Sequence, residues 1–173
     1  MIATLIDRQF EANLWANETL IALCATLDDE QLMVEGEGVF GRIRPTIVHI
    51  LQGEGNYLRD LAGANPWADL SDWDNLSFDQ LLAMAKQSGA ALREAAKRGD
   101  PDQTIEYEDE DEFATFKRWT VLNQAIHHGI EHRTQLKILL TKLGVPHPDL
   151  SVWGFAAALG ELQITPKATR TNS

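Results

Sequence analysis

The sequence has little cysteine and few basic residues. Cys24 is the single cysteine among 173 residues, so no disulfide can form within the chain. Lys and Arg total 15 against 26 Asp and Glu, which gives a net charge of −11. Such a charge disfavours contact with the phosphates of DNA or RNA and with an anionic membrane surface. The composition excludes a disulfide-stabilised domain and predicts no nucleic-acid partner and no membrane partner.

Long apolar runs and targeting signals are also absent from the sequence. No stretch reaches the roughly 18 uninterrupted apolar residues that mark a membrane-spanning helix. The opening MIATLIDRQF lacks the basic segment followed by an apolar segment that is typical of a secretory signal. Glycine-rich phosphate loops and a GxSxG element are missing as well. We therefore expect a cytoplasmic protein.

Hydrophobic residues make up 44% of the chain, which is enough for the core of one domain of this length. They recur at the spacing of amphipathic helices. Ser77 and Gln80 form a capping-box pattern at the start of one such segment, and Gly99 stops it. The spacing predicts helices over residues 3–27, 45–61, 115–143 and 152–162, and another between Ser77 and Gly99.

Four amphipathic helices and a short extra one at the C-terminal end predict an all-α fold, because each apolar stripe needs helical neighbours to cover it. We expect a four-helix bundle over residues 1–163, with long connections between helices and a mobile tail at 164–173. Residues 103–116 alternate apolar and acidic side chains, so an irregular loop and a small hairpin both stay open, and we assign no sheet.

The run NQAIHHGIEHRTQL contains the most informative residues. His128 and His132 are four residues apart on the apolar stripe of their helix, which places both imidazoles on one face, while His127 points to a flank. Two such rings can share a metal ion, or they can be core residues hydrogen-bonded to Gln124 or Gln135. Gly129 stands where a zinc protease motif HExxH needs its general base, so this is not that motif.

A metal site would need a third ligand from another helix, and His49 is the main candidate. Helical periodicity places His49 nearly opposite the apolar stripe of its own helix, which would make it a surface residue. Residues 47–51 are otherwise apolar, however, and Gly53 one turn later leaves room beside His49 for a ligand or another backbone. Both readings of His49 stay open on the residues alone.

Several polar residues interrupt the apolar faces. Glu54 lies on the apolar stripe, where it could orient a metal-bound imidazole, act as a general base, or pair with Arg133 or Arg59. Asn13 and Asn17 break the face of the first helix, so they either line a polar cavity or are core amides with satisfied hydrogen bonds.

These elements together resemble the DinB/YfiT-like family of small bacterial helical metalloproteins. The likeness rests on NLWANETL in the first helix, TIVHILQGEGNYL in the second, and HGIEHRTQL followed by LGVPHPDL near the end. His128, His132, Arg133 and Gln135 carry the family signature of two histidines with three residues between them, followed by Arg and Gln. Thr134 stands where the family usually has glycine, and it is not one of the ligand positions.

The resemblance implies a four-helix bundle that holds a divalent metal through His49, His128 and His132, and so turns His49 inward. It also implies chemistry, because family members of known activity include transferases and isomerases that use the thiols bacillithiol or mycothiol. A small-molecule substrate and a low-molecular-weight thiol are the partners that follow from it.

Three imidazoles leave at least one coordination position open, which is typical of a catalytic metal. Zinc is the default ion, and nickel, copper or iron also suit imidazole ligands. Two other functions stay open: metal-dependent hydrolysis of a small substrate with Glu54 as the base, and a non-enzymatic metal-binding or sensing bundle. Exposed apolar helix faces favour a homodimer.

Overall fold

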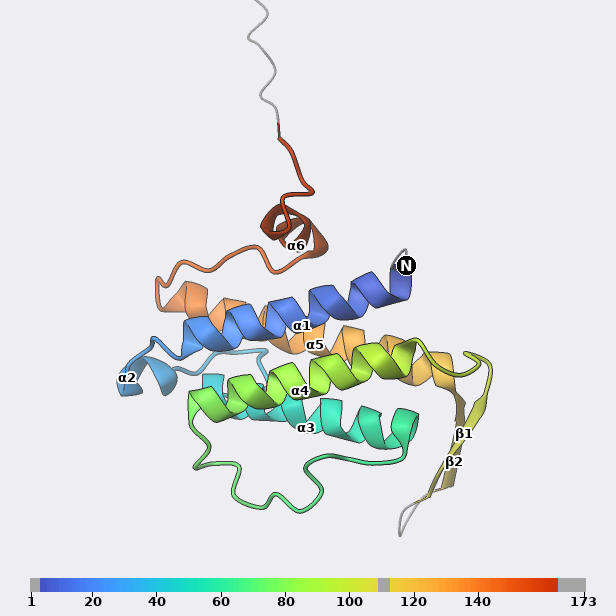
Figure 1. Ribbon diagram of the computed structural model, residues 1–173. Coiled ribbons are helices and arrows are strands. Elements are labelled where there is room, and N and C mark those ends of the chain that lie inside the picture. The colour runs from blue at the N-terminus through green and yellow to red at the C-terminus, as the bar shows by residue number, and fades with distance from the viewer. Residues whose placement is uncertain (1–3, 109–112, 165–173) are drawn as a thin grey trace, which may run out of the picture.

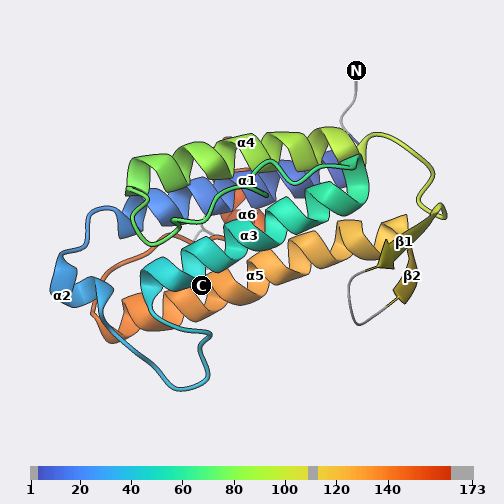
Figure 2. The same cartoon turned by 90° about the horizontal axis from the view of Figure 1, so that it is seen from below.

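The computed structural model describes residues 4–108 and 113–164. It confirms the all-α prediction, because four long helices pack side by side (Figure 1). Each helix has two neighbours: α1 packs on α4 and α5, and α3 packs on the same two helices from the other side (Figure 2). The helices are α1 (Leu5–Cys24), α2 (Asp29–Leu32), α3 (Ile43–Ala62), α4 (Phe78–Ala96), α5 (Arg118–Lys142) and α6 (Val152–Ala158).

Local sequence signals account for several helix ends. The Ser77 side chain accepts a hydrogen bond from the backbone N–H of Gln80, and the Gln80 side chain accepts one from the N–H of Ser77, so the predicted capping box is confirmed. Gly63 ends α3 in the left-handed conformation, with φ of 85°, which glycine adopts without strain. α3 begins at Ile43, and Pro45 lies in its first turn, where backbone N–H groups have no partner within the helix.

Two short elements differ from the prediction. The first is α2, which starts with a capping box between Asp28 and Gln31 in a stretch without apolar periodicity. The second is an antiparallel hairpin of β1 (Thr104–Glu108) and β2 (Phe113–Lys117), whose connecting residues 109–112 lie outside the described residues. Its pairing delays the start of α5 to Arg118, so the predicted start of that helix at 115 and the assignment of no sheet are wrong.

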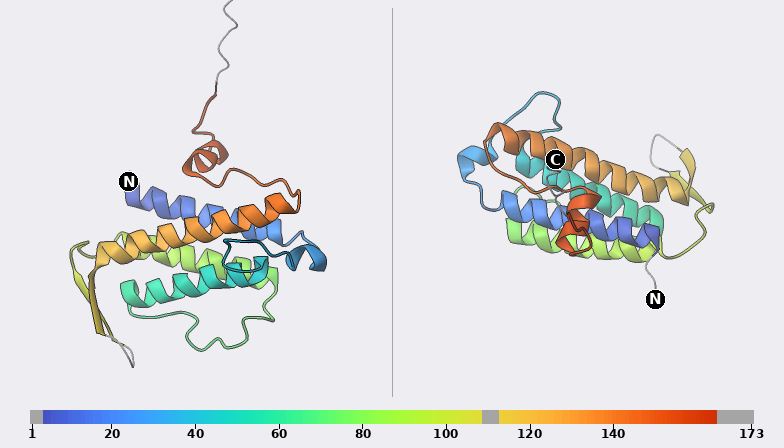
Figure 3. Two further views of the ribbon diagram at one scale, coloured as in Figure 1. Left: turned by 180° about the vertical axis from the view of Figure 1, so that it is seen from behind. Right: turned by 90° about the horizontal axis from the view of Figure 1, so that it is seen from above.

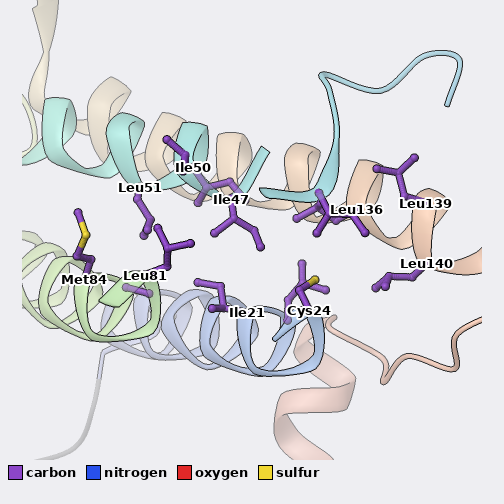
Figure 4. Packing of buried hydrophobic residues seen from close by; sticks show 14 residues of the cluster. Ile21, Cys24, Ile47, Ile50, Leu51, Leu81, Met84, Leu136, Leu139 and Leu140 are labelled. Atoms are coloured by element: carbon purple, nitrogen blue, oxygen red, sulfur yellow. The ribbon is translucent and has the colours of Figure 1, made fainter. Parts of the chain in front are cut away.

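The hairpin forms because the apolar side chains of its two strands pack against the bundle. Ile105 pairs with Phe116, and both pack against the second of two apolar clusters in the bundle. The first cluster contains Cys24, which is fully buried, together with Ile21, Leu81 and Met84 (Figure 4). Burial raises the pKa of the Cys24 thiol to about 12, so this residue is a core side chain and not a nucleophile.

The C-terminal segment lies outside the four-helix layer. α6 crosses over α1 on one face of the bundle (Figure 3), where Phe155 packs 5.6 Å from the ring of Trp15. This helix ends at Ala158, earlier than the predicted 162. The predicted tail at 164–173 lies outside the described residues apart from Ile164. Among the described helices, none combines the length and the apolar character that crossing a membrane requires.

Candidate metal centre

Three imidazoles meet between α3 and α5. His49 comes from α3, and His128 and His132 come from successive turns of α5. The ring centroids are 4.9 Å apart for His49 and His128, 4.6 Å for His49 and His132, and 4.5 Å for His128 and His132. One nitrogen of each ring lies within 4.8 Å of the others, so this three-histidine cluster could hold a metal ion.

Gly53 makes room for one of these rings. A Cβ atom built on Gly53 would lie 2.6 Å from Cε1 and 3.0 Å from Nδ1 of His128. Any side chain at this position would therefore push the imidazole of His128 out of its place. The space beside His49 that the sequence suggested is filled by a histidine from the neighbouring helix.

The position of His49 corrects the expectation from periodicity alone. His49 is half-buried, because Phe40 from the loop between α2 and α3 packs on its ring. Figure 2 shows this loop passing α5. Phe40 in this loop stacks on the His49 ring at 4.0 Å and 16°, and meets His132 edge-on at 5.3 Å. Sequence reasoning missed Phe40, since the only signal was one aromatic side chain between Gly38 and Gly41.

Gln135 determines which nitrogen of His132 is free. The side-chain oxygen of Gln135 lies 2.9 Å from His132 Nδ1, and a carbonyl oxygen can only accept, so the proton is on Nδ1. Nε2 then keeps its lone pair for a ligand. The same oxygen accepts the backbone N–H of Phe40 at 3.1 Å. Gln135 thus contacts both the His132 imidazole and the loop that contains Phe40.

The surroundings of His49 and His128 keep these two imidazoles neutral near pH 7. Burial lowers the pKa of His128 to about 4, with further lowering from His132 and His49. Burial also lowers the pKa of His49, again with a contribution from His132. Neutral imidazoles are the form that binds metal ions.

The distance between two of the imidazoles fits a shared cation. Nε2 of His49 lies 3.1 Å from Nε2 of His128, close to the separation of about 3.3 Å that two nitrogens have on one tetrahedral zinc ion. Nδ1 of His128 is buried and has no hydrogen-bond partner among the described residues. A buried polar atom without a partner costs free energy, and a cation on the Nε2 atoms would leave that cost in place.

Glu54 lies in a separate buried polar layer that reaches all four long helices. Its Oε1 accepts hydrogen bonds from Nδ2 of Asn17 at 2.8 Å and of Asn13 at 3.3 Å, both on α1. Its Oε2 accepts a hydrogen bond from the hydroxyl of Ser88 on α4. Burial raises the pKa of Glu54, while Ser88 and Arg133 act in the opposite direction.

Arg133 completes this layer from α5. Its Nη1 donates to Oδ1 of Asn13 at 2.8 Å and of Asn17 at 2.6 Å, so the two amides lie between the guanidinium and the Glu54 carboxylate. Burial lowers the pKa of Arg133 to about 10, which leaves it charged at neutral pH. Gly129 makes the approach possible, because a Cβ there would lie 2.6 Å from Nη1 of Arg133. Of the two arginines predicted as partners of Glu54, Arg59 pairs with Asp60 instead.

The other histidines stay outside the cluster. His127 is exposed, as its predicted flank position requires, and His147 contacts the hydroxyl of Thr141 at 3.2 Å. Tyr57, which sequence reasoning also missed, meets His128 edge-on at 5.7 Å. Burial raises the pKa of the Tyr57 phenol, so this group carries its proton near neutral pH.

A comparison with models of known protein families matches the description "DinB family" over residues 1–163. The chain belongs to the DinB family. Among curated proteins, no match is found. In this DinB-family protein, Arg133 and Gln135 of the signature have different tasks: Arg133 holds the buried layer, and Gln135 orients His132.

We expect Gln135→Leu to weaken metal binding by about 10–100-fold, because it removes the acceptor that orients His132 and holds the loop at Phe40. Gln135→Glu keeps an acceptor and should bind metal like the original protein. Thr134→Ala is a matched control on the exposed face of the same helix. Competition with a metallochromic chelator measures the affinities. Equal affinities for the Leu and Glu variants would contradict this role.

Proposed function

We propose that this DinB-family protein is a divalent-metal-dependent enzyme that uses a low-molecular-weight thiol as an S-transferase or isomerase acting on a small molecule. His49, His128 and His132 would hold the cation. The observation that supports this most is the donor set: three imidazoles converge, and no Cys, Asp or Glu joins them among the described residues. Such a set keeps a position open for substrate. Zinc is the proposed ion, and nickel suits the same ligands.

A cation held by His49, His128 and His132 would supply Lewis acidity, which favours the thiolate form of a thiol near neutral pH. Gln135 fixes the tautomer of His132, and Phe40 covers one face of the His49 ring. Cys24 is buried in the core, so the reacting sulfur would come from a dissolved thiol.

Hydrolysis is the second candidate reaction, and it needs a base near the open position. Glu54 is the proposed residue for that role, but both of its oxygens already accept hydrogen bonds from α1 and α4. A metal-held thiol needs no protein carboxylate, which is why we favour the thiolate route. The homodimer and the cytoplasmic location stay predictions, which sedimentation and cell fractionation would check.

The metal content of the purified protein tests the ligand assignment. We expect a stoichiometric divalent ion in the original protein and a loss of that ion when His49, His128 and His132 are all changed to Ala. His127→Ala and His147→Ala are matched controls, because these histidines lie outside the cluster. Elemental analysis after dialysis gives the result. Retention of the ion by the triple variant would refute the assignment.

A second experiment separates the candidate reactions. Metal-loaded protein is mixed with bacillithiol or mycothiol and a chlorodinitrobenzene acceptor, and in parallel with a small activated ester. Thiol adduct formed only by metal-loaded protein supports the transferase. Ester cleavage without thiol supports hydrolysis, and neither product at any metal loading supports a binding or sensing bundle and refutes the enzyme.

A further inference from the structure

A cavity of about 350 Å³ lies on another face of the bundle from the three-histidine cluster, and none of the three histidines lines it. Its walls come from α1, from α5 and from residues 149–152, which precede and begin α6. Figures 1 and 3 show this segment returning from the end of α5 toward α1 before α6 crosses over α1. The volume is within the range of small-molecule sites in proteins.

Arg133 lines this cavity, and only one nitrogen of its guanidinium donates hydrogen bonds to the described residues. The residue is 4% exposed, and its two hydrogen bonds, to Asn13 and Asn17, both start from Nη1. Nε and Nη2 have no hydrogen-bond or ion-pair partner among the described residues. Both nitrogens keep some exposed surface. Among the described residues, the only side-chain nitrogen or oxygen that is fully buried and has no partner is Nδ1 of His128.

These two groups form the edge of a guanidinium that binds carboxylates with two parallel hydrogen bonds. Arg133 has no carboxylate in direct contact among the described residues, since Asn13 and Asn17 separate it from Glu54. An anion that enters the cavity would therefore meet two N–H donors of a charged guanidinium. Arg133 is already largely buried, and Asn13 and Asn17 hold it in place.

The remainder of the wall fits an apolar body behind the anionic group. Its apolar residues are Ala12, Ile126, Ile130, Leu150 and Val152. Two charged residues also line the cavity, Lys137 and Asp149. The Asp149 carboxylate accepts hydrogen bonds from the backbone N–H and the hydroxyl of Ser151, both at 2.9 Å, and Lys137 offsets its charge. A free cationic edge and an apolar wall are thus the features that the cavity offers.

We propose that this cavity binds a small monocarboxylic acid with an apolar body. The carboxylate accepts two hydrogen bonds from Nε and Nη2 of Arg133, and the body packs against Ile130 and Val152. The site needs no metal ion, so it is independent of the function proposed for the histidines.

Benzoate and its neutral isostere benzamide are suitable probes. Each is titrated by calorimetry into the full-length protein, once loaded with metal and once treated with a chelator. We expect benzoate to bind at least about tenfold more tightly than benzamide, with the same affinity in both preparations. In NMR spectra, the Nε–H resonance of Arg133 should shift with benzoate and not with benzamide.

Two variants of α5 provide a matched pair. Ile130 and Ile138 are similarly exposed, at 49% and 48%, but only Ile130 lines the cavity. Ile130→Glu places a competing carboxylate near Arg133 and should weaken benzoate binding at least about tenfold, whereas Ile138→Glu should leave it unchanged.

Three results would overturn the proposal: equal binding of benzoate and benzamide, equal binding by the two variants, or benzoate binding that disappears with the metal. The last result would place benzoate at the histidines, and it would leave the proposed metal function intact.

Discussion

Replacing Arg133 with Met lowers the free energy of unfolding by about 3–5 kcal/mol, which is the size of loss expected when a buried carboxylate loses the positive charge that compensates it. The variant leaves the Glu54 carboxylate buried without a compensating charge and leaves the oxygens of Asn13 and Asn17 without their donor. Urea denaturation of the metal-free protein, followed by circular dichroism, measures the change.

An exposed arginine is the control for this experiment. The side chain of Arg98 is 77% exposed and lies 3.8 Å from Glu94, so Arg98→Met should cost less than about 1 kcal/mol. The double variant Glu54→Leu and Arg133→Met should lose less stability than the two single variants together, since it leaves no unpaired charge. Equal costs for Arg133→Met and Arg98→Met would show that the buried layer does not stabilise the fold.

Gly53→Ala weakens metal binding by about 10–100-fold without unfolding the protein, a loss of the size seen when groups that orient a ligand are removed. The new Cβ would lie 2.6 Å from Cε1 of His128, so the imidazole must turn away from His49. Alanine is a better helix former than glycine by about 1 kcal/mol, so the free energy of unfolding of the metal-free protein should stay level or rise.

Gly41→Ala separates this effect from a general effect of glycine replacement. A Cβ at Gly41 would meet only the hydroxyl of Thr46, at 4.0 Å, which is an ordinary contact. This variant should bind metal like the original protein. If Gly53→Ala also keeps its affinity, His128 is not a ligand, or its ring can move without loss.

Much of the fold could be predicted because helices have local signals. Apolar periodicity indicated the four long helices, and the Ser77 capping box placed the start of α4 correctly. The spacing of His128 and His132 is a property of one helix, so it was sufficient to place both rings on one face. The hairpin was left open, because five alternating residues in a strand also fit an irregular loop, and its pairing depends on a distant apolar cluster.

The sequence by itself determined which helices form and that two imidazoles share one face, since both follow from contacts within a few residues along the chain. Only the tertiary structure decided that His49 joins them, because the face of α3 opposite its apolar stripe is covered by a loop and by α5. The same holds for the link of Arg133 through two amides to Glu54 and for its open edge in the cavity. Helical periodicity describes one helix, whereas these sites depend on the register between helices, which side-chain packing sets.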